Sequence, residues 1–130
     1  MKTLACRYSR KQAIRKGLLF DVSSLARKQG YFTPVAITPA VWTKCVIVPR
    51  ELRSSRNIIG SLWDVLCDLN LTAQETAANS VEFKTLVENS VDETDEVSLV
   101  GNCGLGDYGK PVVTITFPDE VPSIALLGLL

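Results

Sequence analysis

The stretch VEFKTLVENSVDETDEVSLVGNCGLGDYGKPVVTITF, residues 81–117, decides the fold class of this chain of 130 residues. Apolar and polar side chains alternate along much of it, which is typical of β-strands with one buried face. The segments that predict strands, each rich in β-branched residues, are 81–87, 96–100 and 111–117. The side chains expected to share one face of the first strand are Val81, Phe83, Thr85 and Val87.

Upstream of this stretch the sequence predicts short helices. Ser9 and Gln12 have the spacing of a capping box, in which each side chain satisfies a free backbone N–H at a helix start. This predicts a helix over residues 10–16, and Gly17, which tolerates a left-handed backbone, is expected to end it.

The next segment repeats this pattern. A second short helix is predicted to begin at Asp21 or Ser23 and to end at Gly30. The apolar residues 35–37 predict a strand, and Thr38, which is followed by proline, is a favourable helix start.

The clearest helix lies in RSSRNIIGSLWDVLCDLN, residues 53–70. Its core-facing stripe is predicted to be Ile58, Leu62, Val65, Leu66 and Leu69. The polar positions expected on the opposite side are Ser61, Asp64 and Asp68. Trp42 and Trp63 lie in apolar helical settings, which favours buried indoles over indoles that stack on bases.

Short helices followed by antiparallel strands predict an α+β domain. We expect helices packed on one face of a small, mainly antiparallel sheet of about three to four strands. Residues 1–130 are expected to form a single domain with a basic, mainly helical part (1–80), an acidic strand part (81–120) and an apolar tail (121–130). The tail is expected either to dock on the core or to be covered by a partner.

The net charge of zero conceals a strong asymmetry. Residues 1–58 carry twelve Lys or Arg and two carboxylates, a net charge of +10, and residues 59–130 carry the reverse, −10. Either the two halves pair as surface ion pairs, or they stay apart and leave a basic face for phosphates or an acidic partner. The candidate binding residues on such a face are Lys11, Arg15, Lys16, Arg27 and Lys28.

Residues 104–110, GLGDYGK, resemble a phosphate-binding loop on a first reading. Such a loop needs Ser or Thr after the lysine and a helix that follows, but here Pro111 and a strand-like run come next. We therefore interpret it as a connection between strands, with its glycines supplying positive φ angles. These glycines are Gly101, Gly104, Gly106 and Gly109.

The residue inventory names no reaction. The chain has no histidine, and its four cysteines lack the paired spacing of a zinc site, so we expect no catalytic residues, metal or cofactor. Widely spaced cysteines and the lack of a secretory signal pattern favour reduced thiols in the cytoplasm. No apolar run approaches the ~20 residues of a membrane-spanning helix, so we expect no membrane association.

Three blocks together resemble a known family: YSRKQAIRKGLLFDVSSLARKQGYFTPVAITPAVW, GSLWDVL and CGLGDYGKPVVTITFPDE, between residues 8 and 120. They are similar to a domain of unknown function in small, uncharacterised bacterial proteins carried on plasmids, phages and other mobile elements. The family that they resemble has no assigned active site, so the resemblance transfers no functional residue to this chain. The resemblance implies an accessory protein of a mobile genetic element.

Composition and resemblance together predict a non-catalytic protein that binds a macromolecule of the host or of the element and thereby modulates a defence or replication system. A protein partner is the first expectation. The alternative is a nucleic-acid-binding protein that uses the basic N-terminal half.

Overall fold

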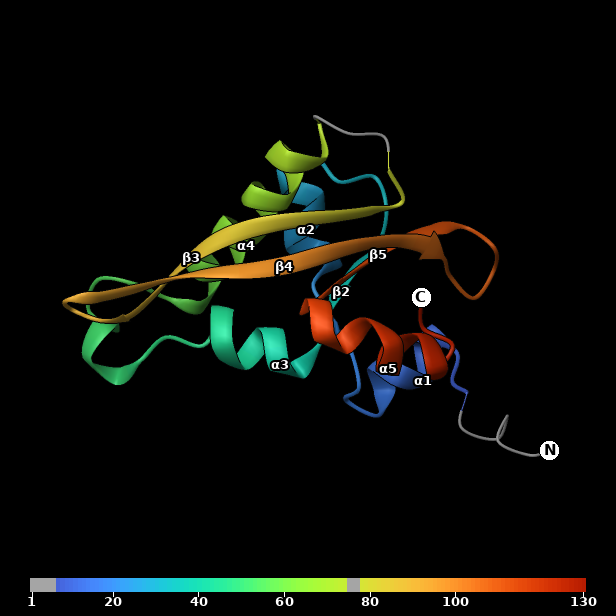
Figure 1. Ribbon diagram of the computed structural model, residues 1–130, viewed down its shortest axis with the longest axis horizontal. Helices are drawn as coiled ribbons and strands as arrows, with labels where there is room; N and C mark the ends of the chain where they lie inside the picture. The colour runs from blue at the N-terminus through green and yellow to red at the C-terminus, as the bar shows by residue number, and fades with distance from the viewer. Residues whose placement is uncertain (1–6, 75–77) are drawn as a thin grey trace.

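The computed structural model describes residues 7–74 and 78–130 and contains a five-stranded sheet with helices packed against it (Figure 1). The helices are α1 (Arg10–Arg15), α2 (Ser23–Gln29), α3 (Pro39–Val41), α4 (Ile58–Ala73) and α5 (Val121–Leu126). The strands are β1 (Phe20–Asp21), β2 (Val35–Ile37), β3 (Ser80–Ser90), β4 (Glu93–Leu105) and β5 (Pro111–Thr116). A π-helical turn, Trp42–Val46, extends α3, and 3₁₀ turns span Arg50–Leu52 and Pro118–Glu120. The predicted α+β class is confirmed.

The sheet has the strand order β1-β2-β5-β4-β3. Strands β2 and β5 run parallel, and the other neighbours pair antiparallel. The sheet is therefore larger than the three to four strands expected from the sequence. The additional strand, β1, spans only two residues, which is too short to produce a recognisable alternation.

Helices cover both faces of the sheet, which corrects the prediction of a single covered face. Val35 and Ile37 of β2 belong to the main core cluster under α2 and α4. Ala36, between them, points the other way and packs with Ala13 of α1 and Ile124 of α5. Figure 1 shows α1 and α5 together near the C-terminus, away from α2 and α4. Every residue of β2 is buried, so the strand needs cover on both faces.

The apolar tail docks on this second face. Ile124 and Leu129 are buried in the smaller core cluster, and the Tyr8 backbone N–H donates to the Leu127 carbonyl at 2.9 Å. Of the two alternatives left by the sequence, the described residues support the docked one, although Leu126 remains exposed.

The predicted helix ends are confirmed at several points. Ser9 and Gln12 form the reciprocal capping box of α1, and the Thr38 hydroxyl accepts from the Val41 backbone N–H. Gly17 and Gly30 follow α1 and α2 with positive φ angles of 77° and 103°. In α4 the predicted stripe is buried apart from Ile58 at its first turn. Ser61, predicted on the polar side, is buried as well.

The glycines of the loop after residue 100 have a different role from the predicted one. Only Gly109 among the four has a positive φ, because β4 continues through Gly101 and Gly104 to Leu105. A Cβ on Gly101 would lie 2.6 Å from Cδ1 of Leu69, and one on Gly106 would lie 2.9 Å from Cγ1 of Val112. At Gly101 and Gly106 it is therefore close packing, and not a positive φ angle, that disfavours a side chain.

We predict that Gly101→Ala lowers the free energy of unfolding by about 1–3 kcal/mol, because the new methyl group overpacks the contact with Leu69 under α4. Chemical denaturation measures this change. Gly60→Ala is the matched control, since a Cβ there meets only Asn57 Oδ1 at 3.4 Å and the helix gains up to about 1 kcal/mol. A Gly101→Ala variant as stable as the unsubstituted protein would contradict the tight helix-to-sheet contact.

Candidate functional site

The five basic candidates are all exposed, and they come from two helices. Lys11 and Arg15 lie on α1 with Lys16 directly after it, and Arg27 and Lys28 lie in the last turn of α2. Because α1 and α2 pack on opposite faces of β2, the fold divides the candidates into two groups. None of the five forms an ion pair within residues 7–74 and 78–130.

Other basic side chains do pair across the two halves of the chain. Lys44 contacts Asp95 at 2.9 Å. Hydrogen bonds with Lys44 and Asn89, together with the charge of Lys44, lower the pKa of Asp95. Arg56 contacts both Asp64 and Glu88 at 3.0 Å. The predicted pairing of the halves therefore holds for Lys44 and Arg56, while the five candidates remain unpaired with carboxylates among the described residues.

A second candidate surface lies on the first turns of α4. Ile59 is 67% exposed and Trp63 is 39% exposed, so the prediction of a buried Trp63 was wrong. They are four residues apart and therefore neighbours on the helix surface. Trp42, in contrast, is half-buried and meets the ring of Phe20 edge to face, with centroids 5.4 Å apart.

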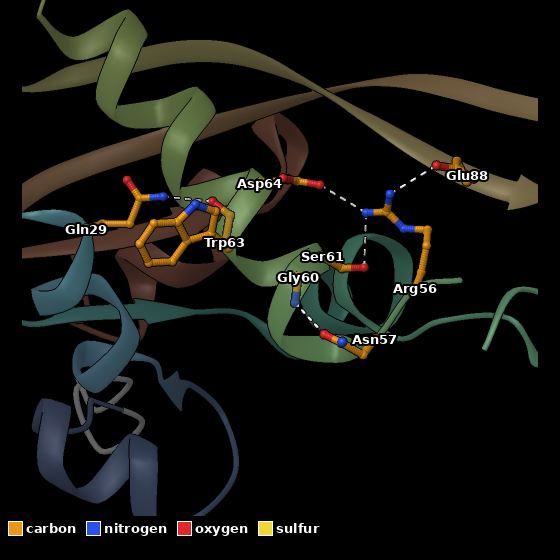
Figure 2. A network of polar contacts seen from close by, with 8 residues as sticks. All are labelled: Gln29, Arg56, Asn57, Gly60, Ser61, Trp63, Asp64 and Glu88. Carbon is orange, nitrogen blue, oxygen red and sulfur yellow. Dashed lines mark hydrogen bonds and ion pairs between the residues drawn. The ribbon is translucent and has the colours of Figure 1, made fainter. Parts of the chain in front are cut away.

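Figure 2 shows how polar contacts fix the backbone and side chains around this indole. The Asn57 side chain caps α4 by accepting from the Gly60 backbone N–H at 2.7 Å, which sets where the helix begins. On the other side, the Gln29 side-chain amide donates to the Trp63 carbonyl at 3.1 Å and ties α2 to α4.

Arg56 closes the opposite side of the same surface (Figure 2). Its Nη2 donates to Asp64 Oδ2 at 3.0 Å and reaches Ser61 Oγ at 3.4 Å, while Nη1 donates to Glu88 Oε1 at 3.0 Å. The buried Ser61 hydroxyl thus has Arg56 as its hydrogen-bond partner. Through Glu88, Arg56 also joins the segment before α4 to strand β3.

These groups surround a hollow of about 430 Å³. We call it the Trp63 surface, and define it by Arg56, Asn57, Ile59, Gly60, Trp63 and Asp64. Its lining combines the apolar side chains of Ile59 and Trp63 with polar groups, and the Arg56 guanidinium is paired with carboxylates. Exposed Trp flanked by Arg is the composition of protein-binding hot spots.

The positions of Ile59 and Trp63 in the sequence of α4 already indicated this surface, although the prediction of a buried Trp63 did not use them. The helical spacing that defines the core stripe of α4 places Ile59 and Trp63 outside that stripe. Two large apolar residues one turn apart on a non-core flank indicate a contact surface. The expectation that tryptophan is buried obscured this pattern.

The described cysteines differ in their accessibility. Among the described residues Cys45 is buried, Cys67 is partly buried and Cys103 is exposed, and all three are free thiols. Cys6 lies outside the described residues. Burial raises the pKa of Cys45 to about 11, against the opposing charge of Lys44. Within the same residues, no group of three or more Cys, Asp or Glu is arranged to hold a metal ion.

We predict that, in a Cys6→Ser background, Ellman's reagent at pH 8 modifies Cys103 rapidly and Cys45 only after denaturant is added. The pKa of about 11 leaves Cys45 protonated at pH 8, and the thiolate is the reactive form. Mass spectrometry of peptides from partly modified protein assigns the sites. Equal rates at Cys45 and Cys103 would contradict the burial of Cys45.

No helix of the described residues is long and apolar enough to cross a membrane. No curated protein and no solved structure matches this chain. A family of unknown function, DUF6573, matches residues 3–121, which include α1, α4 and every strand of the sheet. The chain belongs to this family of unknown function.

Proposed function

We propose that this protein is a non-catalytic binding protein that contacts a protein partner through the Trp63 surface. The observation that supports the proposal is the exposed pair Ile59 and Trp63 on the rigid start of α4. A tryptophan held in place by a capped helix loses little conformational freedom on binding. Such preorganised aromatic residues contribute most of the binding free energy at protein interfaces.

The charges around the indole favour a protein over a nucleic acid. Arg56 and Asp64 are the charged residues of the Trp63 surface, and they pair with each other and sum to zero. Arg56 is also paired with Glu88, so the surface offers phosphates no free positive charge, whereas a protein with an exposed apolar patch can pack on Ile59 and Trp63.

The setting of this binding is part of the same proposal. We infer an accessory protein of a mobile genetic element, acting in the bacterial cytoplasm on a host or element-encoded protein of defence or replication. This setting is supported by the resemblance of the sequence blocks described above, and the family itself carries no assigned function.

We predict that Ile59→Ala/Trp63→Ala raises the Kd for the partner at least about tenfold, because truncating hot-spot residues costs about 2 kcal/mol or more. Tagged protein is used to retain partners from host cells, with nuclease present, and the retained protein is then purified for titration calorimetry. Leu105→Ala/Leu126→Ala is the matched control, since both leucines are more than 70% exposed on other elements.

Trp63 also supplies a direct optical readout. In a Trp42→Phe background Trp63 is the remaining tryptophan of the two in the chain, and its emission should shift to shorter wavelength when the partner covers it. Unchanged emission at saturation, or equal retention of the partner by Ile59→Ala/Trp63→Ala, would overturn the proposal. A retained protein that vanishes with nuclease would do the same.

A second function, nucleic-acid binding, is favoured by the exposed cations that lack ion pairs among the described residues. These are Lys11, Arg15, Lys16, Arg27 and Lys28. Unpaired lysine and arginine side chains can neutralise phosphates and release counterions, which makes affinity fall steeply with salt.

For this second function, we predict that Lys11→Glu/Arg15→Glu abolishes binding to duplex DNA or RNA at low salt, measured by fluorescence anisotropy. Lys44→Glu/Lys84→Glu makes the same change in net charge at lysines that already contact carboxylates, and it should weaken binding less. An equal loss for both pairs would indicate an effect of net charge alone. If the unsubstituted protein fails to bind at low salt, this second function is excluded.

A further inference from the structure

A pocket on the face of the sheet opposite α4 shares only Lys11 with the binding surfaces above and is otherwise assigned no role by them. It lies between α1 and the loop that joins β4 to β5, and its volume is about 420 Å³. Ile14, Pro34, Pro111 and Val112 contribute apolar walls, and Tyr108, 87% exposed, lies at its edge. This volume falls within the range of about 300–1,000 Å³ that is typical of small-molecule sites.

The polar group that distinguishes this pocket is the guanidinium of Arg10. The residue is only 9% exposed. Its Nη1 donates to Thr114 Oγ1 and its Nη2 to the Val113 carbonyl, both at 2.7 Å, and both acceptors are neutral. These hydrogen bonds use two of five N–H donors.

Arg10 makes no ion pair within residues 7–74 and 78–130. Burial lowers the pKa of Arg10, and the more distant charges of Asp21 and Asp107 oppose this shift. Side chains with a buried charge are normally paired with an opposite charge, so the guanidinium is available to an anion from outside the chain.

The two carboxylates of the pocket are engaged elsewhere. Asp107 accepts from the backbone N–H groups of Arg10 and Lys11, at 2.7 and 3.0 Å. Asp21 accepts from the backbone and hydroxyl of Ser23 at the start of α2. Both carboxylates therefore satisfy local donors and leave the guanidinium without a bonded counter-ion.

The charges lining the pocket do not cancel. Arg10, Lys11 and Lys110 supply three positive charges and Asp21 and Asp107 two negative ones, a net charge of +1. One monoanionic group would neutralise the pocket, whereas a dianionic phosphate would leave an excess of negative charge. The planar fork of arginine matches the two oxygens of a carboxylate.

We propose that this pocket binds a small molecule with an apolar body and one carboxylate group. The carboxylate contacts Arg10 with Lys11 and Lys110 around it, and the apolar body packs on Ile14, Val112 and the ring of Tyr108. The site goes beyond protein binding by the Trp63 surface and is independent of it, because α1 and α4 cover opposite faces of the sheet.

The test compares 4-phenylbutanoate with its neutral amide, 4-phenylbutanamide, by titration of ¹⁵N-labelled protein followed by NMR. The carboxylate should bind at least about tenfold more tightly, and the backbone signals of Tyr108, Lys110 and Val112 should shift. The ratio of the affinities for the acid and the amide should stay the same in excess inorganic phosphate. Phosphate screens the non-specific attraction of anions to the basic surface but does not fill the pocket.

Variants locate the site without disturbing the buried arginine. Lys11→Gln/Lys110→Gln should weaken binding of 4-phenylbutanoate several-fold and leave the amide unaffected, because both lysines are exposed and line the pocket. Lys16→Gln/Lys28→Gln removes the same charge outside the pocket and should have little effect. Equal affinity for acid and amide, displacement by phosphate, or equal losses in the two double variants would overturn the proposal.

Discussion

The central strand β5 is buried on both faces, and the architecture follows from that constraint. Its residues 112–116 are all buried, although two of them, Thr114 and Thr116, are polar. The main core under α4 takes Val113 and Ile115. The other face therefore has to be covered as well, and its hydroxyl groups have to be hydrogen-bonded, because unpaired polar groups are costly in the interior.

The second helical layer covers this face, and Arg10 of α1 donates to the Thr114 hydroxyl. The Thr116 hydroxyl accepts from the side chain of Asn102 in β4, which also donates to the Thr114 carbonyl. The loop after β4 returns to hold α1 through Asp107, so the glycine-rich segment contacts a helix start with a carboxylate of its own. A phosphate-binding loop holds a phosphate at the start of a helix. Here the Asp107 carboxylate of the loop accepts from the backbone N–H groups at the start of α1 instead.

Local features of the fold could be predicted from the sequence, and non-local ones could not. The capping box at Ser9, the stop at Gly17 and the strands of 81–117 depend on residues close in sequence. The parallel pairing of β2 with β5 joins residues more than seventy positions apart, and nothing local encodes it. The threonines of VVTIT alternate with apolar residues, which by itself predicts a strand with one exposed face. Both threonines are buried instead, because Arg10 and Asn102 hydrogen-bond to their hydroxyl groups.

The candidate surfaces divide in the same way. The basic excess of the N-terminal half is visible in the sequence, but which cations stay unpaired depends on tertiary contacts such as Arg56 with Glu88. The exposure of Trp63 could have been inferred from helical spacing. The pocket at Arg10 could not, because it joins α1 to residues about one hundred positions later.

That separation has a consequence for how the protein is made. The bond from Arg10 to Thr114 spans 104 positions, so during translation α1 emerges long before the strand that anchors it. A six-residue helix is too short to be stable alone. We therefore expect α1 to be fixed only after a loop of about one hundred residues has closed, and the entropy of closing that loop favours slow folding.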